Sequence, residues 1–117
     1  MLLDRKEIQK NNGDLIIEGY YDSSNILKTA YIPNKEFMFI FFQNKLVYSY
    51  SNISKELYEK FENADSQGKF FISEIKKKPK LYNYLKEYTL YEFEKQDIIN
   101  TIESLKSGEI DQKPNIL

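Results

Sequence analysis

The chain has 117 residues, of which 41% are hydrophobic and 15% aromatic, and this composition predicts one folded domain with a single core. Its 17 basic and 18 acidic side chains leave a net charge of −1, which excludes a strong whole-molecule attraction to nucleic acid or to an anionic membrane. The absence of cysteine and histidine excludes disulfides, thiolate zinc sites and Ser-His-Asp catalysis. No apolar run approaches the roughly 20 residues that span a bilayer. We therefore expect a protein without membrane contact that is cytoplasmic, or packaged into a virion if it is phage-encoded.

Four strands are predicted after a charged lead-in at residues 1–13, in which a helical turn is compatible with the sequence. Runs of β-branched and aromatic residues, separated by turn-forming residues, indicate strands at 15–21, 26–32, 37–42 and 46–50. The run at 37–42 is apolar throughout, which predicts a central strand covered on both faces. In the last run a period of two places Leu46, Tyr48 and Tyr50 on one sheet face.

Helices are predicted after Ser54, which is positioned to cap a helix over residues 55–64. A second short helix or turn follows it. The spacing of leucine and tyrosine favours a helix at 81–91, although tyrosines also suit a strand. A clearer amphipathic pattern predicts a helix that ends at Gly108.

These elements predict an α+β fold, with a four- to five-stranded, mainly antiparallel sheet followed by two to three helices. The expected parts are a lead-in at 1–13, a sheet and helix domain at 14–80, a helical extension at 81–108 and a flexible tail at 109–117.

Short motifs between residues 23 and 76 carry a family resemblance. They are Ser23-Ser24-Asn25-Ile26, Tyr31, Tyr48-Ser49-Tyr50 and the segment from Ala64 to Phe71. Their order and spacing resemble the KTSC domain family, which occurs at the C-terminus of some lysyl-tRNA synthetases and as stand-alone bacterial and phage proteins. The family-motif residues are Ser23, Ser24, Tyr31, Ser66, Gly68 and Phe71. The sequence departs from the family pattern at Ala30, Lys45, Ser54 and Ile72, which stand where glycine, glycine, proline and asparagine are usual.

The resemblance implies a non-enzymatic binding module of the KTSC type, and RNA or single-stranded nucleic acid is the ligand that the family suggests. The residue types agree, because tyrosines on one sheet face can stack bases and lysines can contact phosphates. The predicted contact residues are Tyr48, Tyr50, Lys69, Phe70, Lys76, Lys77 and Lys78. The same tyrosines also fit an ordinary core, and the lysines fit a solvated helix end, so both interpretations stay open.

Two alternative functions come from other classes. One is a structural or accessory assembly protein, such as a phage or virion component, which contacts a protein partner or itself through the C-terminal helix. The other is an oligomer that sequesters a small nucleotide. We expect no catalytic residues and no cofactor. Ser73 and Lys76 match the spacing of a serine acyl-enzyme motif, but its companion motifs are missing, so chance explains the match. We also expect no metal site, since Glu59, Glu62 and Asp65 are typical of a solvated helix face.

Overall fold

A six-stranded antiparallel sheet forms the centre of the computed structural model, in which residues 1–108 are described. The strands lie side by side in chain order: β1 (Leu2–Gln9), β2 (Leu15–Tyr21), β3 (Ile26–Ile32), β4 (Phe37–Phe42), β5 (Leu46–Tyr50) and β6 (Tyr84–Thr89). The predicted α+β class and antiparallel sheet are confirmed, with six strands in place of four or five. The predicted tail at 109–117 lies outside the described residues.

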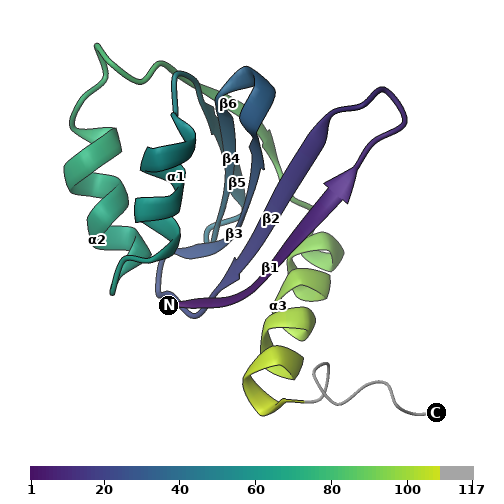
Figure 1. Ribbon diagram of the computed structural model, residues 1–117. Coiled ribbons are helices and arrows are strands. Elements are labelled where there is room, and N and C mark those ends of the chain that lie inside the picture. The colour runs from purple at the N-terminus through teal and green to yellow at the C-terminus, as the bar shows by residue number, and fades with distance from the viewer. Residues whose placement is uncertain (109–117) are drawn as a thin grey trace.

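Helices cover both faces of the sheet (Figure 1). On one face lie α1 (Lys55–Glu62) and α2 (Gln67–Phe71), which continues into the π-helical turn η2 (Ile72–Lys76). On the other face α3 (Glu92–Ser107) packs against β1 and β3. A short 3-10 turn, η1 (Pro33–Lys35), precedes β4. Among residues 1–108, no helix combines the length and the apolar character needed to cross a bilayer.

The four strands predicted between residues 14 and 51 have the predicted bounds. As expected, β4 lies inside the sheet, and its Met38 and Ile40 are fully buried. Phe39 lies between these two residues, so its side chain points to the opposite face of the sheet. It is only half-buried, because α3 covers that face incompletely.

Residues 2–9, predicted to be a lead-in, form strand β1, so that prediction was wrong. The strand pairs with β2 along its length, and Gly13 closes the hairpin with a φ of 90° that glycine adopts without strain. The physical reason for the error is that β1 is an edge strand. Its charged residues are solvated, so the strand shows little apolar alternation.

Residues 81–91, predicted to be helical, contain strand β6, so that prediction was wrong as well. The strand pairs antiparallel with β5, and the register shifts between Val47 and Tyr48. All six of its residues are exposed, because β6 forms the second edge of the sheet. The spacing of its leucine and tyrosine residues is also typical of a helix, but pairing with β5 determines the conformation of the strand.

The helix ends follow the predicted chemistry. The Ser54 Oγ accepts a hydrogen bond from the Leu57 amide at 3.1 Å and caps α1. Ser66 caps α2 in the same way, through the Lys69 amide at 3.2 Å. Gly108 ends α3 with a φ of 82°.

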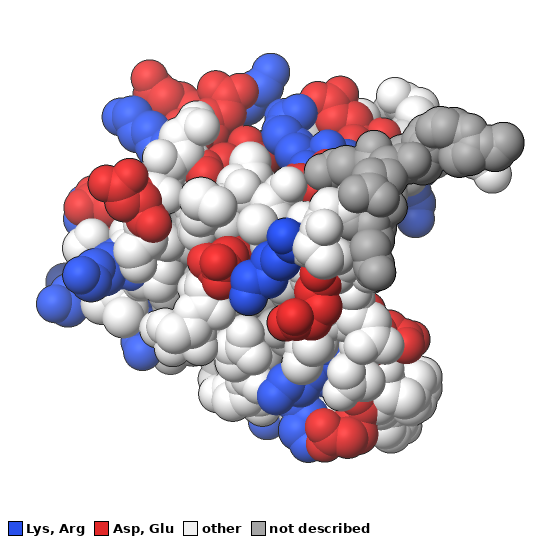
Figure 2. All heavy atoms as spheres, turned by 90° about the horizontal axis from the view of Figure 1, so that it is seen from below, with Lys and Arg blue, Asp and Glu red and all other residues white. Residues whose placement is uncertain are grey.

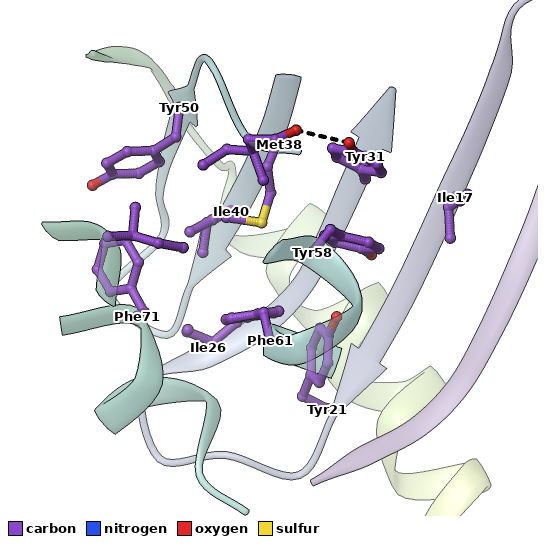
Figure 3. Packing of buried hydrophobic residues seen from close by; sticks show 12 residues of the cluster. Ile17, Tyr21, Ile26, Tyr31, Met38, Ile40, Tyr50, Tyr58, Phe61 and Phe71 are labelled. Atoms are coloured by element: carbon purple, nitrogen blue, oxygen red, sulfur yellow. Dashed lines mark hydrogen bonds between the residues drawn. The ribbon is translucent and has the colours of Figure 1, made fainter. Parts of the chain in front are cut away.

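The main core lies between the sheet and the helices α1 and α2 (Figure 3). The ring of Tyr31 stacks on that of Tyr58 with centroids 4.3 Å apart, and the Tyr31 hydroxyl donates to the Ile53 carbonyl at 2.7 Å. The Thr29 hydroxyl oxygen lies 2.8 Å from the Tyr21 oxygen and 2.9 Å from the Tyr58 oxygen. Burial raises the pKa of Tyr58 to about 12, so its hydroxyl is protonated at neutral pH. These contacts fix α1 on the sheet.

Candidate functional site

A groove of about 670 Å³ opens between strands β4 to β6 and the segment formed by α2 and η2. Six aromatic side chains line it: Phe42, Tyr48, Tyr50, Phe71, Tyr82 and Tyr84. A volume of this size falls within the range of small-molecule sites, which are mostly apolar with a few polar groups. The described residues therefore present a groove rich in aromatic side chains.

Three tyrosines from neighbouring strands, Tyr48, Tyr50 and Tyr84, form a tyrosine cluster in this groove. Tyr84 is the register partner of Tyr50, and residues two apart in β5 share a face, so the three side chains project to the same side. The ring centroid of Tyr84 lies 6.0 Å from those of both other tyrosines, and the Tyr48 and Tyr50 centroids lie 6.5 Å apart. Tyr84 is 57% exposed, so its ring is open to a ligand.

Tyr50 is the buried member of the tyrosine cluster. It is 5% exposed and packs edge-on against Phe71, with ring centroids 5.2 Å apart (Figure 3). Burial raises the pKa of Tyr50 to about 12, so its hydroxyl is protonated at neutral pH. Tyr50 therefore belongs to the core and to the floor of the groove at once, whereas Tyr48 is half-buried and faces the groove.

Asn25, Gln43 and Asn44 line the groove, and the Gln43 backbone amide donates to the Asn25 backbone carbonyl at 2.9 Å, so the two turns that carry them lie together. This part of the groove is here named the carboxamide end. The Gln43 Nε2 donates to the Ser23 carbonyl at 3.3 Å, and the Asn44 Oδ1 accepts from the Leu46 amide at 3.1 Å. A Cβ atom at position 68 would lie 3.0 Å from the Asn25 Nδ2. Glycine at position 68 thus allows Asn25 to approach α2 closely.

The predicted contact residues are only partly brought together. Tyr48, Tyr50 and Lys76 line the groove. Three other lysines are exposed and do not line it: Lys69, Lys77 and Lys78. The Lys78 Nζ pairs with Glu74 at 3.3 Å. Phe70 instead packs against Phe61 at the edge of the core, with ring centroids 6.2 Å apart.

The family-motif residues have mainly structural positions. The Ser23 Oγ accepts from the amides of Asn25 and Ile26 at 3.3 and 3.2 Å and shapes the turn before β3. Ser24 is exposed in that turn. Tyr31 lies in the core and Ser66 caps α2, as described above. Gly68 and Phe71 line the groove.

Two departures from the family pattern lie at informative places. Lys45, at a hairpin position where the family has glycine, has a φ of 76°, in the left-handed region that glycine adopts without strain. Ile72, which stands where the family has asparagine, lines the groove and makes its wall more apolar.

Charges of both signs are interspersed over the face shown in Figure 2. The carboxylates interpreted above as a solvated helix face include Glu62, and that interpretation was wrong for this residue. Glu62 is 5% exposed, and its Oε2 lies 3.1 Å from the Arg5 Nε of β1. In residues 1–108 no group of three or more acidic side chains is arranged to hold a metal ion.

Sequence reasoning missed several lining residues: Asn25, Gln43, Asn44, Tyr82 and Tyr84. For Tyr84 a signal existed, because Tyr84, Lys86 and Tyr88 alternate with other residues in a tyrosine-rich run that suits a strand. For the carboxamides no pattern in the sequence indicated that two separate turns meet beside α2.

Two comparisons with known proteins found a match. The family model for the KTSC domain matches residues 22–78. The chain is similar to the crystal structure of a KTSC domain protein from Yersinia pestis, with 28% sequence identity and a TM-score of 0.56 over 61% of this chain and 96% of that one. No curated protein matches the chain. Because the family match ends at residue 78, Tyr82 and Tyr84 of the groove lie beyond it.

Proposed function

Residues 22–78 belong to the KTSC domain family, and from this premise we propose that the chain is a non-enzymatic module that binds single-stranded RNA in its aromatic groove. The observation that carries the proposal is the tyrosine cluster, which offers ring faces from two adjacent strands on one side of the sheet. Proteins that bind single strands commonly stack bases on such rings, and each base contributes about 1–3 kcal/mol.

Charge contributes less to this binding than aromatic contact. Lys76 is the one cationic side chain that lines the groove in the described part of the chain. Lys86 is the register partner of Tyr48, so it projects from the same sheet face nearby. One or two phosphate contacts predict a shallow salt dependence, with a slope of about −0.7 to −1.4 in a plot of log affinity against log salt.

The first test replaces Tyr84 by alanine. We expect the affinity for a fluorescently labelled single-stranded RNA hexamer, measured by anisotropy, to fall about tenfold, since one stacking face is lost. Tyr91→Ala is the matched control, because Tyr91 is 69% exposed and does not line the groove. Lys76→Glu is expected to weaken binding more than Lys77→Glu at the neighbouring position. Equal losses of affinity in Tyr84→Ala and Tyr91→Ala, and in Lys76→Glu and Lys77→Glu, would rule the proposal out. Absence of binding by the native chain at low salt would also rule it out.

The second candidate function is self-assembly, and a separate surface favours it. Tyr91 and Phe93 at the start of α3 are 69% and 66% exposed, with stacked rings 5.7 Å apart. They adjoin the exposed edge strand β6, whose free backbone groups can pair with a strand of a second copy. The inner face of α3 is not available for this contact, because Ile102 and Leu105 are buried against the sheet of the same chain.

If self-assembly is the function, light scattering on the native chain gives a defined oligomer, and Phe93→Asp converts it to a monomer by placing a charge in the contact. Ile8→Asp, at an exposed apolar position on the opposite edge strand, is the control and leaves the oligomer intact. A monomer at high protein concentration contradicts this second candidate and leaves the RNA proposal unaffected.

A further inference from the structure

We infer that the groove recognises an unpaired adenine base through its carboxamide end, an inference that rests on the RNA-binding function proposed above. The argument uses the orientation of the groove, the types of polar side chain that line it, and the hydrogen-bonding capacity that those side chains retain.

The groove has two chemically different ends. Gly68 lies at the carboxamide end, against Asn25, and Lys76 lies eight positions later on the continuous segment formed by α2 and η2. Eight helical residues span about 12 Å. A bound nucleotide can therefore direct its base toward the carboxamides and its phosphate toward Lys76, with the tyrosine cluster beside the base and the sugar.

The polar side chains at the base end are of the type that contacts adenine in duplex DNA. In the major groove of duplex DNA, guanine is typically read by arginine or lysine, cytosine by aspartate or glutamate, and adenine by asparagine or glutamine, which offer one donor and one acceptor side by side. In the described chain, the side chains that line the groove include three carboxamides but no arginine and no carboxylate. Lys76 lies toward the other end, where a phosphate is expected.

The carboxamides keep free hydrogen-bonding capacity. Within residues 1–108, Gln43 uses its Nε2 and Asn44 uses its Oδ1 in hydrogen bonds of the chain itself, which leaves the Gln43 Oε1 as an acceptor and the Asn44 Nδ2 as a donor. Adenine fits this combination, because its amino group donates and its adjacent ring nitrogen accepts. The acceptor and the donor then come from two neighbouring side chains in place of one carboxamide. Unpaired bases in single-stranded RNA expose these edges fully.

The experiment compares three labelled RNA hexamers by anisotropy: hexauridine, and the same hexamer with one central adenosine or one central cytidine. We expect the adenosine hexamer to bind about tenfold more tightly than the other two. Unlabelled adenosine monophosphate is expected to displace the label at a lower concentration than uridine monophosphate. Displacement by neither nucleotide would overturn the assignment of the base to the groove.

The decisive variant is Asn44→Asp. An aspartate keeps the acceptor that holds the Leu46 amide, so the turn is retained, but it replaces the free donor by an acceptor. The adenosine preference is expected to be lost, because a carboxylate has no donor for the adenine ring nitrogen. Asn34→Asp adds the same charge in the exposed turn η1, away from the groove, and is expected to keep the adenosine preference.

The two proposals fail in different ways. Equal affinity of the native chain for the three hexamers overturns adenine recognition but leaves RNA binding in place. An adenosine preference that Asn44→Asp does not change overturns the role of the carboxamide end. Absence of binding to all three hexamers at low salt overturns the proposed function itself.

Discussion

Replacing Tyr58 by alanine is expected to lower the free energy of unfolding by about 3–5 kcal/mol, because the change leaves a cavity at the centre of the main core. Tyr58 is fully buried between α1 and the sheet, where its ring stacks on Tyr31 and its hydroxyl shares a hydrogen bond with Thr29. A domain of this size has a stability of about 5–15 kcal/mol, so the variant loses a large part of it.

Urea denaturation followed by circular dichroism measures this loss. Tyr91→Ala is the matched control, since the same truncation at a side chain that is 69% exposed should change the stability by less than about 0.5 kcal/mol. Tyr58→Phe keeps the ring and removes one buried hydrogen bond, and should cost about 1 kcal/mol. Similar stabilities of Tyr58→Ala and Tyr91→Ala would show that α1 does not pack on the sheet as described.

The second large effect is expected at Arg5, whose replacement by alanine should destabilise the fold by about 2–3 kcal/mol at neutral pH. The change leaves the buried carboxylate of Glu62 without its partner at 3.1 Å. We expect a smaller loss of stability than for a fully buried pair, because the Arg5 side chain is 32% exposed and water screens its charge. This ion pair also ties the edge strand β1 to α1, so hydrogen exchange in β1 should accelerate.

The pH dependence of this variant follows from the carboxyl group of Glu62. Its pKa is raised, because burial outweighs the attraction of Arg5, so the charged form is disfavoured in the folded state. Without Arg5 the pKa rises further. The loss of stability caused by Arg5→Ala is therefore largest at pH values well above the raised pKa of Glu62 in the variant. It becomes smaller as the pH falls through that pKa toward the ordinary value of about 4.5.

Urea unfolding at pH 7 and pH 5 measures this difference. Adding Glu62→Gln to Arg5→Ala removes the buried charge, so the double variant should recover stability at pH 7 and lose the pH dependence. Lys78→Ala, which breaks the exposed pair with Glu74, is the control and should cost less than about 0.5 kcal/mol at either pH. A cost of Arg5→Ala that is small and independent of pH would contradict the buried pair.

The inner strands and the helix caps could be predicted from the sequence, because local chemistry determines them. The run Phe37–Phe42 has side chains that suit a central strand, and Ser54 and Gly108 stand where a helix can begin and end. The two edge strands could not be predicted in the same way. Half of the hydrogen-bonding groups in β1 and β6 face away from the sheet and their side chains are solvated, so the apolar pattern used for prediction is weak there.

The candidate site was predictable only where a single strand carries it. Tyr48 and Tyr50 share a face because of the period of two in β5, which the sequence shows directly. Tyr84 joins them through strand pairing across more than 30 positions of the chain. The approach of Asn25 to Gly68 likewise joins distant segments, and neither arrangement has a local sequence signature.

The most direct test of RNA binding in the groove is a nuclear magnetic resonance titration of the native chain with the uridine hexamer that carries a central adenosine. The account predicts that the largest shift changes cluster at the ring signals of Tyr48 and Tyr84, the side-chain amide of Asn44 and the backbone amide of Lys76. Changes confined to the exposed lysines 69, 77 and 78, with the tyrosine rings unaffected, would contradict it.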